Sequence, residues 1–164
     1  MKHTALAALL LLAGASASAD DVTRYPLPNN STFPIAQAVE TPAGTTLIFH
    51  SGTTPAPANP DAERGSPEFW GDTEAQSLSV FERMDESFKN LGVGFGDVVK
   101  MTVFLVGVPE QDGRMDFGGF MKAYTKYFGT TAQPNLPARS AVQVAGLAAP
   151  GMLVEIEVIL ARPK

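Results

Sequence analysis

Two acidic side chains stand on an otherwise apolar segment near the C-terminus. Glu155 and Glu157 are two positions apart within residues 152–161, and apolar residues fill all the other positions. Because side chains alternate across a strand, both carboxylates share one face. A charge in an apolar setting costs free energy unless it is solvated, paired or used. Such a carboxylate can activate water as a general base, and a simply solvated face is the structural alternative.

One arginine stands at the entrance of a second apolar segment. Arg139 follows Pro137 and precedes residues 140–144. Its guanidinium presents a planar fork of donors that suits a carboxylate in two parallel hydrogen bonds. Arg139 is therefore a candidate for holding a carboxylate substrate, and an ion pair with Glu155 or Glu157 is the structural alternative.

Three further positions combine polar chemistry with a strand end or a long loop. Ser51 and Gly52 follow a β-branched segment, where they either present a hydroxyl and an N–H to a ligand or form an ordinary turn. His50 precedes them, and we favour a structural role for its ring over a place in the site. Trp70 either covers a pocket or anchors the loop at residues 53–71, and we favour anchoring.

The composition excludes several classes of chemistry. The 164 residues include no cysteine, which rules out disulfides, thiolate catalysis and cysteine metal sites. Only two histidines occur, so we expect no metal centre. The formal net charge of −5 argues against non-specific nucleic-acid binding, which needs a basic surface. The glycine-rich nucleotide-binding motifs and the nucleophile-elbow motif are also absent from the sequence.

The N-terminus has the pattern of a secretory signal peptide. A basic start at residues 1–3 precedes an apolar stretch at residues 5–13 and an Ala-Ser-Ala cleavage site at residues 17–19. We therefore predict a signal peptide at residues 1–19 and a single exported domain at residues 20–164. It would be periplasmic in a Gram-negative cell and secreted otherwise, with no membrane association after cleavage.

Periodicity predicts one mixed sheet with two helices on one face. The helices are expected at residues 72–91 and 115–128, where apolar residues recur every three or four positions. The strands are expected at residues 35–39, 45–50, 98–106, 140–144 and 152–161. Two helices cover only one face of such a sheet, so the other face needs cover, which self-association would provide.

The sequence resembles the Rid family of RidA- or YjgF-like reactive-intermediate deaminases, from about Phe33 to the C-terminus. The segments that carry the resemblance are Ser51-Gly52 and residues 97–104, 116–124, 137–140 and 154–157. It implies a chorismate-mutase-like α/β (α+β) sandwich, assembled as a homotrimer with clefts between subunits. It also implies hydrolysis of 2-imino acids or enamines to 2-oxo acids and ammonia, without cofactor or metal.

The resemblance also assigns roles to residues. The position of Arg139 implies a hold on the substrate carboxylate, which is catalysis by positioning. The position of Glu155 implies that it orients or activates the attacking water. Ser51 and Gly52 would line the cleft. The partners implied are a small imino or enamino carboxylate and further copies of the same chain.

Three positions depart from the family pattern. Ile35, Met121 and Ala141 stand where deaminases commonly carry tyrosine, asparagine and cysteine. Ile35 and Met121 are therefore expected to line the substrate site as apolar side chains. The leading hypothesis is a 2-iminobutanoate/2-iminopropanoate deaminase-like hydrolase. The alternatives are a non-catalytic module of the same fold that binds small carboxylates, and a protein-binding or holdase role through exposed apolar surface.

Overall fold

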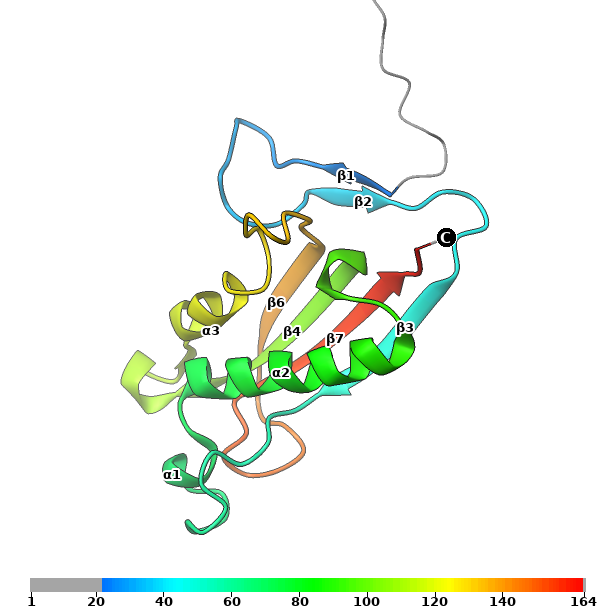
Figure 1. Ribbon diagram of the computed structural model, residues 1–164. Coiled ribbons are helices and arrows are strands. Elements are labelled where there is room, and N and C mark those ends of the chain that lie inside the picture. The colour runs from blue at the N-terminus through cyan, green and yellow to red at the C-terminus, as the bar shows by residue number, and fades with distance from the viewer. Residues whose placement is uncertain (1–21, 164) are drawn as a thin grey trace, which may run out of the picture.

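Two long antiparallel strands form the centre of the sheet. In the computed structural model, which describes residues 22–163, they are β4 (Val98–Val108) and β7 (Val154–Ala161). The strand β3 (Leu47–Thr53) pairs antiparallel with β7, and β6 (Ala138–Val144) pairs parallel with β4 on the other side. The two-residue strand β5 (Arg114–Met115) pairs antiparallel with the C-terminal end of β4. The edges are therefore β3 and β6, with mixed pairing between them (Figure 1).

Two helices lie on one face of this sheet (Figure 1). The helix α2 (Thr73–Leu91) begins where the Asp72 carboxylate accepts a hydrogen bond from the Ala75 N–H, and it ends at the left-handed Gly92. The helix α3 (Phe117–Tyr124) is capped in the same way by Asp116. Both carboxylates also lie at the positive end of their helix dipole, where a negative charge stabilises the helix.

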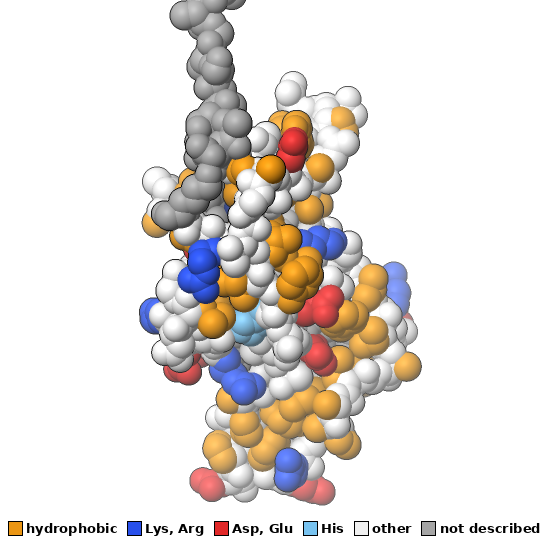
Figure 2. Space-filling view, turned by 90° about the vertical axis from the view of Figure 1, so that its right-hand side faces the viewer, with side chains coloured by type: hydrophobic (Ala, Val, Ile, Leu, Met, Phe, Trp, Pro, Cys, Tyr) orange, Lys and Arg blue, Asp and Glu red, His pale blue; other side chains and the backbone are white. Residues whose placement is uncertain are grey.

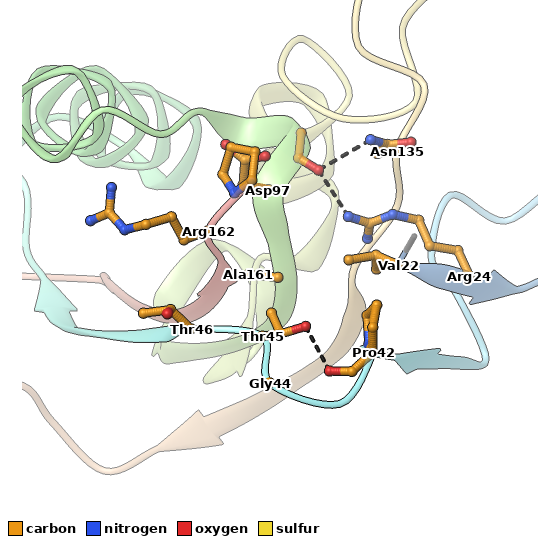
Figure 3. A pocket seen from close by; sticks show the side chains of 12 residues that line it. Val22, Arg24, Pro42, Gly44, Thr45, Thr46, Asp97, Asn135, Ala161 and Arg162 are labelled. Carbon is orange, nitrogen blue, oxygen red and sulfur yellow. Dashed lines mark hydrogen bonds between the residues drawn. The ribbon is translucent and has the colours of Figure 1, made fainter. Parts of the chain in front are cut away.

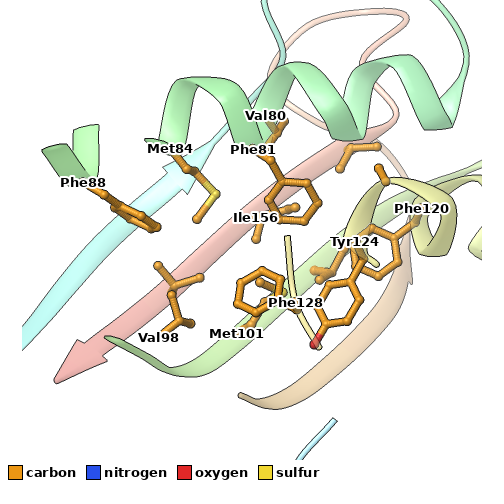
Figure 4. Close-up of a cluster of buried hydrophobic side chains, with 14 of the residues drawn as sticks. Val80, Phe81, Met84, Phe88, Val98, Met101, Phe120, Tyr124, Phe128 and Ile156 are labelled. Atoms are coloured by element: carbon orange, nitrogen blue, oxygen red, sulfur yellow. The ribbon is translucent and has the colours of Figure 1, made fainter. Parts of the chain in front are cut away.

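The core lies between the helices and the sheet, and it follows the predicted periodicities. Alternate side chains of β4 and β7 are buried beneath α2 and α3 (Figure 4). The sheet contributes Met101, Val103, Leu105, Val154, Ile156, Val158 and Leu160, and the helices contribute Val80, Phe81, Met84, Phe88, Phe120 and Tyr124. The opposite face of β7 carries Glu155 and Glu157, as the alternation predicted.

The N-terminal region contains a hairpin that the sequence did not predict. A short hairpin forms from β1 (Thr23–Tyr25) and β2 (Ala38–Glu40), so the expected strand at residues 35–39 is displaced toward the chain's C-terminus. The hairpin is fastened by Arg24, whose guanidinium donates to three backbone carbonyls of the main body. Hydrophobic pattern alone did not reveal this strand, because an arginine makes the contact.

The second helix is shorter than the predicted residues 115–128. Met115 belongs to β5 and pairs with Gly107 of β4, so the helix begins only at Phe117. After Tyr124 the chain tightens into turns, in which the Tyr127 N–H donates to the Tyr124 carbonyl three residues earlier. Gly129 then has a positive φ of 71°, which diverts the chain away from a helical path.

The long loop at residues 53–71 is anchored as predicted. It contains a one-turn helix, α1 (Pro67–Trp70), and the Trp70 indole donates a 2.8 Å hydrogen bond to the Pro150 carbonyl. The buried Gln76 amide also joins this region to the turn before β7, donating to the carbonyls of Gly71 and Gly151. Two 3-10 turns, Phe95–Asp97 and Pro109–Gln111, flank β4.

The predicted signal peptide lies outside the described residues. Among residues 22–163, no helix is both long enough and apolar enough to span a bilayer.

Candidate functional site

Arg139 projects from the helix-covered face of the sheet into a group of aromatic side chains. It pairs with Met101 on β4, whose side chain is buried beneath the helices. We call the surrounding rings the aromatic box. Its members and their centroid distances from the Arg139 Cζ atom are Tyr124 at 4.2 Å, Phe120 at 5.1 Å, Phe33 at 5.5 Å and Phe117 at 5.6 Å. Each ring contributes roughly 0.5–2 kcal/mol of cation–π attraction.

The box leaves part of the guanidinium without a hydrogen-bond partner. The Arg139 Nη1 atom is buried and has no acceptor among residues 22–163. Burial lowers the pKa of Arg139, an effect that the nearby Tyr124 opposes. Burial also raises the pKa of Tyr124 to about 12, so its hydroxyl is protonated at neutral pH and donates to the Pro34 carbonyl. An unsatisfied buried donor costs about 1–3 kcal/mol, so this position favours an anionic acceptor.

Glu155 lies on the other, open face of the sheet. A bulge in β3 between His50 and Thr53 contains Ser51 and Gly52, and Gly52 lies against the Glu155 side chain. A Cβ atom at Gly52 would clash with the Glu155 carboxylate, so glycine is needed for the carboxylate to occupy this position. Bulges commonly re-aim side chains next to active sites.

The structural alternative for Arg139, an ion pair with Glu155 or Glu157, does not form. No carboxylate of residues 22–163 lies within 4.0 Å of the Arg139 guanidinium. Arg139 is level with Met101 and Glu155 with Phe104, so the two are three residues apart along the sheet and two strands apart across it. That geometry separates their Cα atoms by roughly 14 Å, and the side chains point to opposite faces.

The predicted site residues therefore fall into two groups. The segment before β2 runs beside the start of β6, where Ala36 bridges to Ala138, and this places Ile35 near Arg139. Met121 belongs to α3, the helix that supplies three rings of the aromatic box. The helix-side group is Arg139, Ile35 and Met121, and the open-face group is Ser51, Gly52 and Glu155.

His50 has the structural role that we favoured. Its ring packs edge-on against Phe88, and its Nε2 atom lies 2.8 Å from the Ser87 Oγ atom. The Nδ1 atom lies 3.0 Å from the Ser51 carbonyl oxygen. Both ring nitrogens are therefore engaged. Within residues 22–163, no group of three or more potential metal-ligating side chains comes together.

Two hollows lie near these groups. One of about 550 Å³ lies between the N-terminal hairpin and the end of β7, where Arg24 donates to the Gly96 carbonyl (Figure 3). Arg162, which also lines it, donates to the Leu91 carbonyl. Another of about 420 Å³ lies on the open face between Ser51, Lys100 and Glu157. From the β3 side, hydrophobic side chains are seen interspersed with acidic and basic ones (Figure 2). The second hollow adjoins the open-face group.

Sequence reasoning missed the aromatic box. Phe117, Phe120 and Tyr124 were assigned only to the buried stripe of a helix, and Phe33 was given no role in the site. A signal was present, because this spacing gathers the three rings on one side of the helix. What the spacing did not indicate was that an arginine from β6 would lie against them.

Comparison with known proteins agrees with this architecture. Residues 30–162 match the family described as endoribonuclease L-PSP. The chain belongs to the Rid family. The Myxococcus xanthus protein DfrA is 35% identical over 127 residues, which are 77% of this chain and 83% of that protein. The rat 2-iminobutanoate/2-iminopropanoate deaminase is 37% identical over 89 residues, which are 54% of this chain and 57% of that enzyme.

Solved structures confirm the predicted Rid fold. Escherichia coli TdcF, crystallised with bound serine, is 29% identical, with a TM-score of 0.55 over 80% of this chain and 91% of that one. The Rid-family protein YyfB of Yersinia pestis has a TM-score of 0.62 at 20% identity, over 85% of this chain and 98% of that one. The sandwich of mixed sheet and two helices is therefore that of the family.

Proposed function

We propose that this Rid protein hydrolyses reactive 2-imino acids and enamines to 2-oxo acids and ammonia. The observation that carries the proposal is the unpartnered, buried Nη1 of Arg139, which lies in the segment of strongest family resemblance. A guanidinium in a dry aromatic setting binds a carboxylate more strongly than it would in water. The imine carbon adjacent to that carboxylate would then be held in one place.

The reaction needs water and no redox partner. An enamine first tautomerises to its imine, water adds to the C=N carbon, and the resulting carbinolamine expels ammonia to leave the 2-oxo acid. We propose that Glu155 accepts a proton from the attacking water and returns it to the departing nitrogen. Ser51 and Gly52 would line the same cleft. Mammalian relatives that carry the name 2-iminobutanoate/2-iminopropanoate deaminase support this reaction class.

The two groups of site residues require more than one copy of the chain. Arg139 and Glu155 face opposite sides of one sheet, so a single protomer does not bring both to one ligand. We propose a homotrimer in which Glu155 of one copy faces Arg139 of the next across a subunit cleft. The exposed apolar side chains Leu47, Phe49 and Val142 support this assembly, because they would gain cover.

The test measures removal of imines. An amino-acid oxidase generates imines from several amino acids, semicarbazide traps them, and a deaminase lowers the yield of trapped product. We expect the purified protein to do so and Arg139→Ala to lose at least about 100-fold of the rate, with an unchanged far-UV circular dichroism spectrum. Arg139→Lys keeps the charge but not the fork of donors, and it should recover little.

Two outcomes would contradict the proposal. Unchanged turnover in Arg139→Ala would remove the arginine from the mechanism. Carboxylate binding without any turnover would favour the second candidate, a non-catalytic carboxylate-binding module. The observation that motivates this alternative is the apolar character of Ile35, in the segment beside the start of β6, and of Met121, on the helix that supplies three rings of the aromatic box.

We also propose that the protein acts outside the cytoplasm. The signal-peptide pattern of residues 1–19 supports this placement. Fractionation of the producing cells, with N-terminal sequencing of the exported chain, would test it.

A further inference from the structure

A hollow of about 360 Å³ adjoins the aromatic box at the start of β6. Much of its lining is apolar, including Pro26, Leu27, Phe33, Ile35 and Leu136. The one charged residue in that lining is Arg24, whose donors are used by the carbonyls of Gly96, Val98 and Leu136. The hollow has the size of a small-ligand pocket, and it favours an apolar occupant.

Phe33 connects this hollow to Arg139. Its ring lines the hollow, lies 5.5 Å from the Arg139 Cζ atom and stacks on Phe117 at 6.4 Å between centroids. Phe33 is 41% exposed, whereas Phe120 and Tyr124 are fully buried. It is therefore the most accessible ring of the aromatic box.

The backbone around Phe33 is held at several points. The Ile35 N–H donates to the Phe33 carbonyl at 2.8 Å, and the Ala36 N–H donates to the Pro137 carbonyl at 3.0 Å. The Tyr124 hydroxyl donates to the Pro34 carbonyl at 2.8 Å. These contacts hold the backbone at Phe33 beside the strand that carries Arg139. The Phe33 ring can then move mainly by rotation about its side-chain torsions.

We propose that Phe33 determines specificity, selecting carboxylates that carry a bulky apolar substituent over the smallest ones. The inference rests on the proposed function, because it assigns the Arg139 Nη1 atom to the substrate carboxylate. Nη1 is buried, so a ligand reaches it when a ring of the box turns aside, and Phe33 is the exposed ring. A substituent of the ligand then packs against Phe33 and Ile35 in the hollow, away from water.

The experiment compares large and small substituents in two assays. Turnover is measured on imines generated from phenylalanine, leucine and alanine. Binding of the stable 2-oxo acids phenylpyruvate and pyruvate is measured by calorimetry. The variants are Phe33→Ala and Phe33→Leu, and the control is Leu91→Ala, which truncates a 37% exposed side chain at the far end of α2.

We expect the wild-type protein to favour the phenylalanine imine and phenylpyruvate by about 10-fold or more, in kcat/KM and in affinity respectively. Phe33→Ala should remove most of that preference, mainly by raising KM, while the small substrate changes less than about twofold. Phe33→Leu should keep part of the preference because it remains apolar. Leu91→Ala should match the wild type.

The two assays separate this inference from the function on which it rests. If no imine is hydrolysed but phenylpyruvate binds in a manner that depends on Phe33, the proposed reaction fails and the specificity role stands. An equal loss on all substrates in Phe33→Ala would overturn the inference, since it would show a merely structural role. An unchanged preference in that variant, a wild-type protein without preference, or no binding of either 2-oxo acid would also overturn it.

Discussion

The two faces of the sheet place their charged side chains in different surroundings. On the helix face, Arg139 is enclosed by aromatic rings, and its Nη1 atom has no acceptor in the part of the chain that the structure describes. On the open face, Glu155 is half-buried and Glu157 is exposed to water, and Glu157 lines a hollow with the polar Ser51. One face holds a half-buried cation against aromatic rings, and the other presents carboxylates to water.

Under the proposed reaction, this difference would explain why two copies of the chain are needed to complete one site. A dry cation strengthens attraction to a bound carboxylate, and a wet carboxylate has access to the water that it activates. Placing them on opposite faces keeps both groups available for the proposed cleft between copies.

The largest expected effect is on the free energy of unfolding, which should depend on whether the substituted side chain packs on the helix face or on the open face. Phe81 is fully buried beneath α2, whereas Phe49 on the open face is 74% exposed. We expect Phe81→Ala to lower the free energy of unfolding by about 3–5 kcal/mol. Phe49→Ala should change it by no more than about 0.5 kcal/mol in a dissociated protomer and should weaken self-association. Urea unfolding and analytical ultracentrifugation measure the two effects. Equal destabilisation by both variants would contradict the comparison.

Mixing two inactive variants tests whether the faces meet between copies. Arg139→Ala and Glu155→Ala should each lose about 100-fold or more of the turnover. Subunits mixed at equal amounts and reassembled should recover about a quarter of the wild-type rate, because that share of clefts receives both intact residues. Mixed assemblies, verified by native mass spectrometry, that stay inactive would place both residues in the same protomer's site.

Gly52 offers a smaller perturbation of the open face alone. Gly52→Ala introduces a Cβ that clashes with the Glu155 carboxylate and displaces it. We expect about a 10-fold loss of kcat with little loss of stability, because the atoms that must move are the far end of the flexible Glu155 side chain. The matched control is Gly94→Ala, where an added Cβ meets nothing within 4 Å. A kcat for Gly52→Ala equal to that of the control would show that the position of Glu155 does not matter.

The smallest effect concerns the helix face and depends on pH. Burial raises the pKa of Tyr124 from 10.0 to about 12, so the folded chain holds this proton more tightly than the unfolded chain. The resulting stability is fully present below pH 10 and is lost as the pH rises toward 12. Tyr124→Phe should lack this alkaline loss and should cost about 1 kcal/mol at pH 7, where the bond to the Pro34 carbonyl is missing.

The measurement for Tyr124 compares urea unfolding of the wild type and Tyr124→Phe at pH 7 and pH 11. Tyr25 and Tyr127 also have raised pKa values, and both variants contain them. The difference between the two proteins therefore isolates Tyr124. Parallel pH profiles would show that its hydroxyl is not buried in the folded state.

The periodic parts of the fold were predictable from the sequence. The alternation in β4 and β7 indicated which side chains are buried, and the apolar stripe of α2 indicated its covered face. These patterns are local, since burial on one face imposes a fixed spacing on the residues of each element. The strand β1 (Thr23–Tyr25) was not predictable in this way, because Arg24 holds it in place through hydrogen bonds to carbonyls that are distant in the sequence.

The chemical content of the site was likewise determined by the sequence, and its arrangement by the tertiary structure. Arg139, Glu155 and the Ser51-Gly52 pair are identifiable from residue type and family motif. That Arg139 faces the helices while Glu155 faces away follows from the registers in which β6 and β7 pair with β4. A one-residue change of register would exchange the two faces of a strand, and register depends on partners far away in the chain.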